Sequence, residues 1–146
     1  MKYFLEVIIN KSRTEVWKIF DDPNNMDKWQ PTLTKIEHLE GLAGQPGSVA
    51  KFTFKNGDRE FSLIGKITFR SEPERLDGVF VNEFADNPVK NTFIENGPNE
   101  TLWKVDVEFK FKTIAMRLIG PFVKKRFATN TQRDMDRFKT LVESSE

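Results

Sequence analysis

The chain has 146 residues, of which 38% are hydrophobic and 31% charged, and its formal net charge is +1. This balance provides for a packed core and excludes a charge-driven association of the whole protein with nucleic acid or an anionic membrane. Cysteine is absent and His38 is the single histidine, which excludes disulfides, thiolate catalysis and metal centres built from cysteines or several histidines. We therefore expect no cofactor and no metal.

The first part of the chain predicts one strand followed by two short helices. Residues 2–10 are rich in β-branched and aromatic side chains, which favour a strand. Ser12 and Glu15 have the spacing of a capping box, and they introduce a helix over residues 15–21. Residues 24–30 predict a second helical turn. The opening stretch is too short and too polar for a secretory signal, so we expect a cytoplasmic protein.

The middle of the chain predicts six strands joined by turns. Glycine, proline, asparagine and aspartate mark these turns at residues 41–47, 56–57, 72–74, 86–88 and 96–99. Apolar and polar residues alternate between them, most clearly over residues 103–111, where one face is apolar and the other charged. Residues 78–84 are apolar on both faces, and there we expect Phe80, Asn82 and Phe84 to face inward.

A long helix closes the predicted fold. From residue 114 the apolar period changes from two to about 3.6, with a break at Gly120-Pro121 where we expect a kink. A seven-stranded sheet must bury one face, and this helix is long enough to cover it. The fold class is therefore α+β, a helix-grip fold: a curved antiparallel sheet wrapped round a long C-terminal helix, with two short helices between strands 1 and 2. We expect a single domain over residues 1–146.

An internal cavity follows from this architecture, because one helix across a curved sheet leaves space that side chains do not fill. We expect its wall to be aromatic and nearly free of ionisable groups. Asn82 and Asn91 share the inward face, where an amide needs a hydrogen-bond partner from a ligand, from water or from a neighbouring side chain. The candidate ligand-cavity residues are Phe52, Phe54, Phe61, Leu63, Phe80, Asn82, Phe84, Asn91, Phe93, Trp103, Val105, Phe127, Thr131 and Met135.

Acid-base chemistry would need a titratable group inside this cavity. The candidates are Glu83, Glu95, Asp134, Tyr3 and His38, and alternation does not decide whether the two glutamates face inward. No two of them form an evident catalytic pair. We therefore assign no catalytic residue and no metal ligand.

Several short motifs occur in order along the chain: residues 15–22 (EVWKIFDD), 29–31 (WQP), Gly41, Gly44, 47–48 (GS) and 72–73 (EP). Together with the long terminal helix, they resemble the START-like (SRPBCC, Bet v 1-like) superfamily, and within it the polyketide cyclase/dehydrase-like branch, over nearly the whole chain. This resemblance implies a hydrophobic ligand cavity between sheet and helix. It does not select a reaction, because the superfamily contains cyclases, aromatases, chaperone co-factors and non-enzymatic carriers.

We expect the protein to bind or transport a small hydrophobic ligand: a lipid, isoprenoid, polyketide or aromatic metabolite. Two alternatives stay open: a polyketide cyclase/dehydratase-like enzyme that moves protons without a metal, and an Hsp90-activator-like interaction module. We expect no nucleic-acid partner and no transmembrane segment. A transient contact with a membrane surface stays open because the last helix carries an excess of cations, Arg117, Lys124, Lys125, Arg126, Arg133, Arg137 and Lys139.

Overall fold

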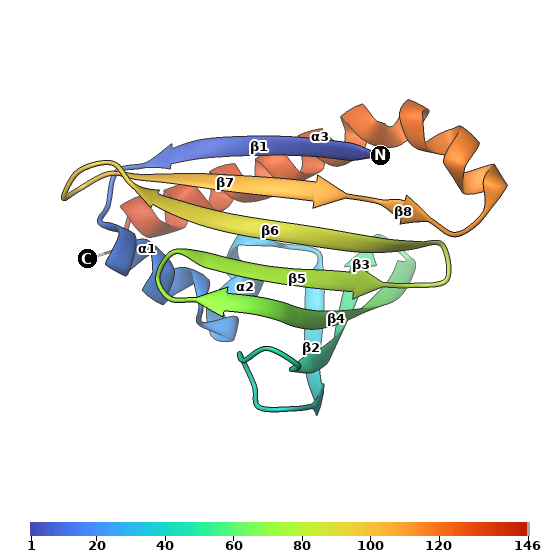
Figure 1. Ribbon diagram of the computed structural model, residues 1–146, viewed down its shortest axis with the longest axis horizontal. Coiled ribbons are helices and arrows are strands. Elements are labelled where there is room, and N and C mark those ends of the chain that lie inside the picture. Colours follow the sequence, from blue (N-terminus) through green and yellow to red (C-terminus); the bar gives the residue numbers. More distant parts are fainter. Residues whose placement is uncertain (146) are drawn as a thin grey trace.

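The computed structural model describes residues 1–145 (Figure 1). In chain order the elements are β1 Lys2–Ile9, α1 Arg13–Phe20, η1 Pro23–Asn25, α2 Met26–Trp29, β2 Leu33–Glu40, β3 Val49–Asn56, β4 Arg59–Ser71, β5 Arg75–Val81, β6 Ala85–Glu95, β7 Thr101–Glu108, β8 Lys110–Phe111 and α3 Ile114–Glu143. The predicted capping box begins α1, where the backbone N–H of Glu15 donates to Oγ of Ser12 at 3.3 Å.

The strands form one antiparallel sheet in the order β1-β7-β6-β5-β4-β3-β2 across the described residues. β8 follows β7 after Phe109 and pairs with β6, so the sheet is seven strands wide. In Figure 1 the second half of α3 runs behind β1 and β7, while its first turns extend past the strands on the right. The predicted helix-grip fold, with its short helices between β1 and β2, is confirmed.

An aromatic cluster joins the short helices, the sheet and α3. Phe138 of α3 is fully buried, and its ring centroid lies 5.0 Å from that of Trp103 on β7 and 5.3 Å from that of Trp29 on α2. Phe20 of α1 lies 4.9 Å from Phe93 of β6, centroid to centroid. These edge-on contacts are the favoured geometry for aromatic rings. They fix the three layers at one end of the sheet.

The turn predicted at residues 86–88 is wrong, because the chain turns at residues 82–84 and Pro88 lies inside β6. Proline is usually excluded from central strands because it cannot donate a ladder hydrogen bond. Here the Asn82 N–H donates to the Ala85 carbonyl, so Asn82 and Ala85 form a hydrogen-bonded pair. Hydrogen-bonded and non-hydrogen-bonded pairs alternate along an antiparallel ladder, and the nitrogen of Pro88 therefore points away from β5. On the opposite side of β6, Pro88 lies where the partner strand changes from β7 to β8. The missing N–H of the proline therefore removes no hydrogen bond from either pairing.

A β-bulge in β4 redirects the side chains at the end of that strand. The register with β5 shifts between Ile67 and Phe69, so Phe69 faces outward under the Arg75 guanidinium instead of continuing the inward alternation of Gly65 and Ile67. Arg70 turns inward as a result. It donates to both carboxylate oxygens of Asp21 on α1, at 2.6 and 2.7 Å, and to the Gly44 carbonyl at 3.1 Å. This arginine connects α1 and the loop after β2 to the sheet.

Candidate functional site

A cavity of about 1080 Å³ lies between the inner face of the sheet and α3. Strands β3 to β7 supply one wall, and Phe127, Thr131 and Met135, spaced four residues apart on α3, supply another. Residues of β1, β2, the short helices and the loop after β2 complete the lining. The strands contribute mostly apolar side chains because their inward positions alternate with solvated ones.

Ten of the fourteen candidate cavity residues line this space. They come from both walls and are Phe52, Phe54, Leu63, Phe80, Asn91, Trp103, Val105, Phe127, Thr131 and Met135. Val107 and Phe109 line it too. They continue the alternation of Trp103 and Val105, so the sequence pattern contained the signal that would have included them. That any of these residues contacts a ligand stays a prediction.

The other four candidates lie outside the lining, and local geometry explains each one. Asn82 and Phe84 belong to the β5–β6 turn, where the Asn82 side-chain oxygen accepts the N–H groups of Phe84 and Ala85 at 2.8 and 2.9 Å. Phe61 stands near the start of β4, half-exposed and stacked on Phe54. Phe93 is buried, but α1 covers its ring, so it belongs to the solid core.

The inward amide of Asn91 is satisfied by the protein itself. Its Nδ2 donates to the Leu76 carbonyl at 3.3 Å, and its Oδ1 accepts the indole N–H of Trp103 at 3.1 Å. Neighbouring protein groups therefore supply the hydrogen bonds that a buried amide requires. Asn91 positions the Trp103 ring on the cavity wall.

Three of the acid-base candidates predicted from the sequence make their contacts away from the cavity interior. Glu83 is exposed in the β5–β6 turn, and exposed Glu95 lies 3.6 Å from Arg13. His38 is exposed at the margin of the cavity, with Nε2 2.7 Å from the Gly41 carbonyl oxygen. Within residues 1–145 there is also no group of three or more aspartate, glutamate or histidine side chains able to hold a metal ion.

Tyr3 and Thr131 form a polar site on the cavity wall between β1 and α3. The expectation of a wall nearly free of ionisable groups is wrong, because the lining also includes Lys66, Arg70 and Asp77. Their oxygens are 3.0 Å apart, and the Thr131 hydroxyl donates to the Phe127 carbonyl at 3.0 Å. A hydroxyl has a single hydrogen, so Tyr3 is the donor to Thr131 when the Thr131 hydrogen is directed to the Phe127 carbonyl. Burial raises the pKa of Tyr3 above its ordinary value, which keeps that proton in place. The Tyr3 oxygen therefore presents only lone pairs to any further partner.

Asp134 lies one helical turn beyond Thr131 and also lines the cavity. Its Oδ1 accepts a hydrogen bond from Nη1 of Arg137 at 2.9 Å. Burial raises the pKa of Asp134 to about 6, although the positive charge of Arg137 acts in the opposite direction. The polar site thus consists of a tyrosine oxygen and a carboxylate, both hydrogen-bond acceptors. Its members come from β1 and α3, which explains why no local motif revealed it.

The raised pKa of Asp134 predicts a measurable dependence of stability on pH. Because the folded state holds this proton more tightly than the unfolded chain, stability falls as pH rises from about 4 to about 6 and stays lowered above that range. Asp134→Asn should therefore stabilise the protein at about pH 7.5, on the order of 1 kcal/mol after screening by solvent. The gain should vanish below about pH 4. Urea unfolding at several pH values across this range measures the gain in stability, and Asp136→Asn, at an exposed position of the same helix, is the control. A gain that does not depend on pH would contradict the prediction.

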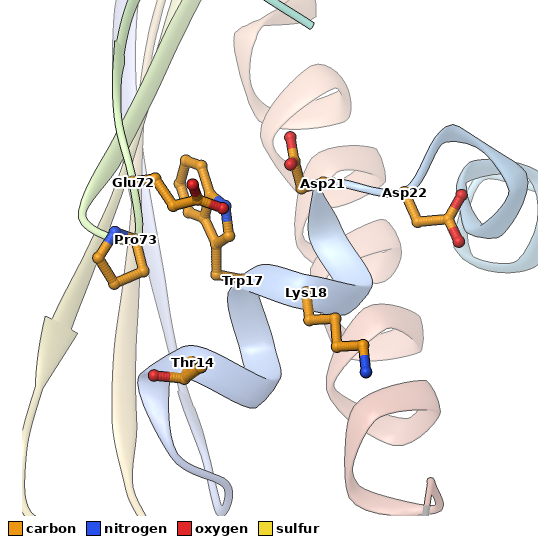
Figure 2. A pocket seen from close by; sticks show the side chains of 7 residues that line it. All are labelled: Thr14, Trp17, Lys18, Asp21, Asp22, Glu72 and Pro73. Atoms are coloured by element: carbon orange, nitrogen blue, oxygen red, sulfur yellow. The ribbon is translucent and has the colours of Figure 1, made fainter.

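A second hollow, of about 540 Å³, lies beside α1 at the β4–β5 turn (Figure 2). Glu72 accepts the indole N–H of Trp17 at 2.8 Å, and the Arg70 guanidinium lies 5.3 Å above the Trp17 ring. Arg70 also forms ion pairs with Asp21 and Glu72, and Trp17 itself is buried. The contacts brace α1 against the sheet.

Over residues 1–145, no helix has the length and apolar character needed to span a bilayer.

Comparison with known proteins agrees with this geometry. The family model for polyketide cyclase/dehydrase and lipid transport matches residues 4–143. The crystal structure of Ara h 8.0201 is 21% identical and superposes with a TM-score of 0.77 over 99% of both chains. A START superfamily protein from Mycobacterium smegmatis is 17% identical, with a TM-score of 0.80 over 97% of both chains.

The Zhui aromatase/cyclase from Streptomyces sp. R1128 is 11% identical, with a TM-score of 0.77 over 98% of this chain and 93% of that one. No curated protein matches the chain by sequence. At such identities the superpositions show the fold alone, whereas the family model covers nearly the full chain. The chain belongs to the polyketide cyclase/dehydrase and lipid transport family.

Proposed function

We propose that this protein binds and carries a small lipophilic molecule whose polar end is a hydrogen-bond donor. The observation that supports it is the cavity of about 1080 Å³, whose wall is apolar over most of its area and includes the polar site of Tyr3, Thr131 and Asp134. Volumes of this order accommodate drug-sized or lipid-sized ligands. A ligand that buries roughly 300 Å² of apolar surface gains about 7 kcal/mol of hydrophobic free energy, from which the cost of its lost motion is subtracted.

The polar site supports the donor end of the ligand. The Tyr3 oxygen has lone pairs to offer but no free hydrogen, and Asp134 carries negative charge above its raised pKa. A ligand hydroxyl or amine satisfies these acceptors, whereas a carboxylate meets like charge and no donor from either group. At this site an alcohol, phenol or amine with an apolar body therefore fits better than a fatty acid.

Binding can be tested on protein purified directly from expression. Native mass spectrometry and solvent extraction should identify a retained lipophilic molecule. After its removal, Nile red should enter the cavity and be displaced by 4-octylphenol with one-to-one stoichiometry. Protein that neither retains a molecule nor takes up Nile red would refute the proposed function.

The Tyr3→Phe variant tests the polar site through a matched pair of ligands. Its affinity for 4-octylphenol should fall about 3- to 10-fold, since one neutral hydrogen bond is lost. Its affinity for 4-octylanisole, which has no hydrogen to donate, should not change. Phe4→Leu alters the neighbouring, exposed side chain of β1 and serves as control. Equal weakening for both ligands would mean that Tyr3 contributes shape and not a hydrogen bond.

A second candidate function, proton-transfer catalysis of the cyclase or dehydratase kind, is favoured by Asp134 alone. A carboxylate in the cavity wall with a pKa near 6 can accept and return a proton at neutral pH. Incubation of the protein with 2-nonanone in D₂O tests this function. Accelerated exchange that Asp134→Asn abolishes and Asp136→Asn preserves would support it, and exchange at the uncatalysed rate would exclude it for simple ketones.

A further inference from the structure

The first half of α3 carries apolar side chains on two opposite faces. On the inner face Gly120 packs so closely against the Phe111 ring that an added Cβ would lie 2.6 Å from it. On the outer face Ile114, Leu118 and Phe122 are 73%, 69% and 87% exposed. These three residues are four positions apart, so they form one continuous stripe along the helix. We call Ile114, Leu118 and Phe122 the outer stripe.

The outer stripe is not explained by packing within the chain. Single exposed apolar residues are common, but an aligned row of large ones marks a contact surface. In Figure 1 these first turns of α3 extend past the ends of the strands, away from the layer that the second half of the helix covers. The stripe therefore faces solvent in the isolated protein and is available to a partner.

Positive charge surrounds the outer stripe. Arg117, Lys124, Lys125 and Arg126 are all exposed, and residues 113–133 contain no aspartate or glutamate. The helix dipole gives no reason for Arg117, because the first turn of a helix carries positive partial charge. An external anionic partner would explain these cations, and the net charge of the whole chain, +1, shows that the excess is local.

We propose that this surface docks on an anionic lipid bilayer, with the outer stripe entering the acyl boundary and the four cations contacting lipid phosphates. Amphipathic helices that lie in membrane interfaces combine Phe and Leu with Lys and Arg in this way. Lysine is depleted in the centres of protein interfaces, which argues against a protein partner. A symmetric second copy would bring the same cations together, which argues against a dimer.

Membrane docking would add to the proposed function of the cavity, and it does not depend on that function. The same helix that carries the outer stripe also lines the cavity, starting at Phe127, which lies 5.2 Å from the Phe109 ring, centroid to centroid. Docking through the first turns of α3 would therefore place the Phe127 end of the cavity wall close to the bilayer. Vesicle binding itself requires no cargo, so it can be measured whether or not the cavity holds a ligand.

Co-sedimentation with vesicles tests the docking surface. Protein should bind phosphatidylcholine vesicles containing about 25% phosphatidylserine, bind pure phosphatidylcholine at least tenfold more weakly, and dissociate as salt is raised. Leu118→Ser/Phe122→Ser and Lys124→Gln/Lys125→Gln should each weaken binding to the anionic vesicles about tenfold or more. Phe4→Ser, which replaces an equally exposed phenylalanine on the outer face of β1, should bind as the unaltered protein does.

Thermal unfolding should show that all variants remain folded, since every substituted side chain is exposed. Binding to anionic vesicles that survives both double substitutions, or no binding by the unaltered protein, would overturn the proposal. Sedimentation equilibrium provides a further check. A self-association that Leu118→Ser/Phe122→Ser removes, without vesicle binding, would assign the outer stripe to a protein contact and overturn it too.

Discussion

Replacing Phe138 by alanine should lower the free energy of unfolding by about 3 to 5 kcal/mol, a large part of the stability of a domain of this size. Its ring is fully buried between α2 and β7, with Trp29 and Trp103 at centroid distances of 5.3 and 5.0 Å. Removing it leaves a cavity enclosed by indole rings that have little freedom to collapse into it. One of the contacts that hold α3 on the sheet is lost with it.

Urea unfolding monitored by tryptophan fluorescence measures this loss. Phe122→Ala is the matched control, because it removes the same ring from the same helix at a position that is 87% exposed, and it should change stability by less than about 0.5 kcal/mol. A similar loss for both variants would mean that stability depends on the helix and not on the aromatic cluster. A loss below about 1 kcal/mol at Phe138 would show that the cluster repacks.

Filling the cavity with Val89→Trp should reduce ligand affinity more than tenfold while leaving the protein folded. Val89 lies on the inner face of β6, opposite Gly78 on β5 and Val107 on β7. Val89 itself lines the cavity, so the indole can extend from this position into the open volume. Overpacking of a filled core would cost about 1 to 3 kcal/mol, and we expect less here.

Lys90→Trp is the control for this experiment, since it adds the same ring to the next residue of β6, on the exposed outer face. Nile red titration and native mass spectrometry compare the two variants. Unchanged affinity in a folded Val89→Trp protein would show that the ligand binds outside this cavity. Equal losses in both variants would point to a general disturbance of β6.

The sequence predicted the sheet well where one face is exposed to solvent and the other is buried. Over residues 103–111 apolar and charged side chains alternate, and the inward set from Trp103 to Val107 is buried in the structure. Prediction failed at residues 82–88, because the apolar segment over residues 78–84 left the register of the strand undecided and Pro88 suggested a turn. The position of Pro88 depends on the interrupted ladder between β6 and its neighbours, which no local pattern records.

The outer stripe of α3 was missed for a related reason. The change of period predicted a helix from residue 114, and in the structure Ile119 is about half exposed, whereas Met116 and Gly120 lie on the packed side. A helical segment in which most positions are apolar fits more than one packed face. Contact with Phe111, a neighbour that only the folded sheet supplies, decides which face packs.

By itself, the sequence determined the order of the elements, the capped first helix, the curved sheet with its long helix and the aromatic character of the interior. These features follow from periodicity, capping and turn chemistry, which act between residues close in the chain. The tertiary structure decided which side chains line the cavity and where its polar site lies. Tyr3 and Thr131 are separated by 128 positions, and the direction of their hydrogen bond depends on a third group, the Phe127 carbonyl. Such a site exists only once β1 and α3 are packed together.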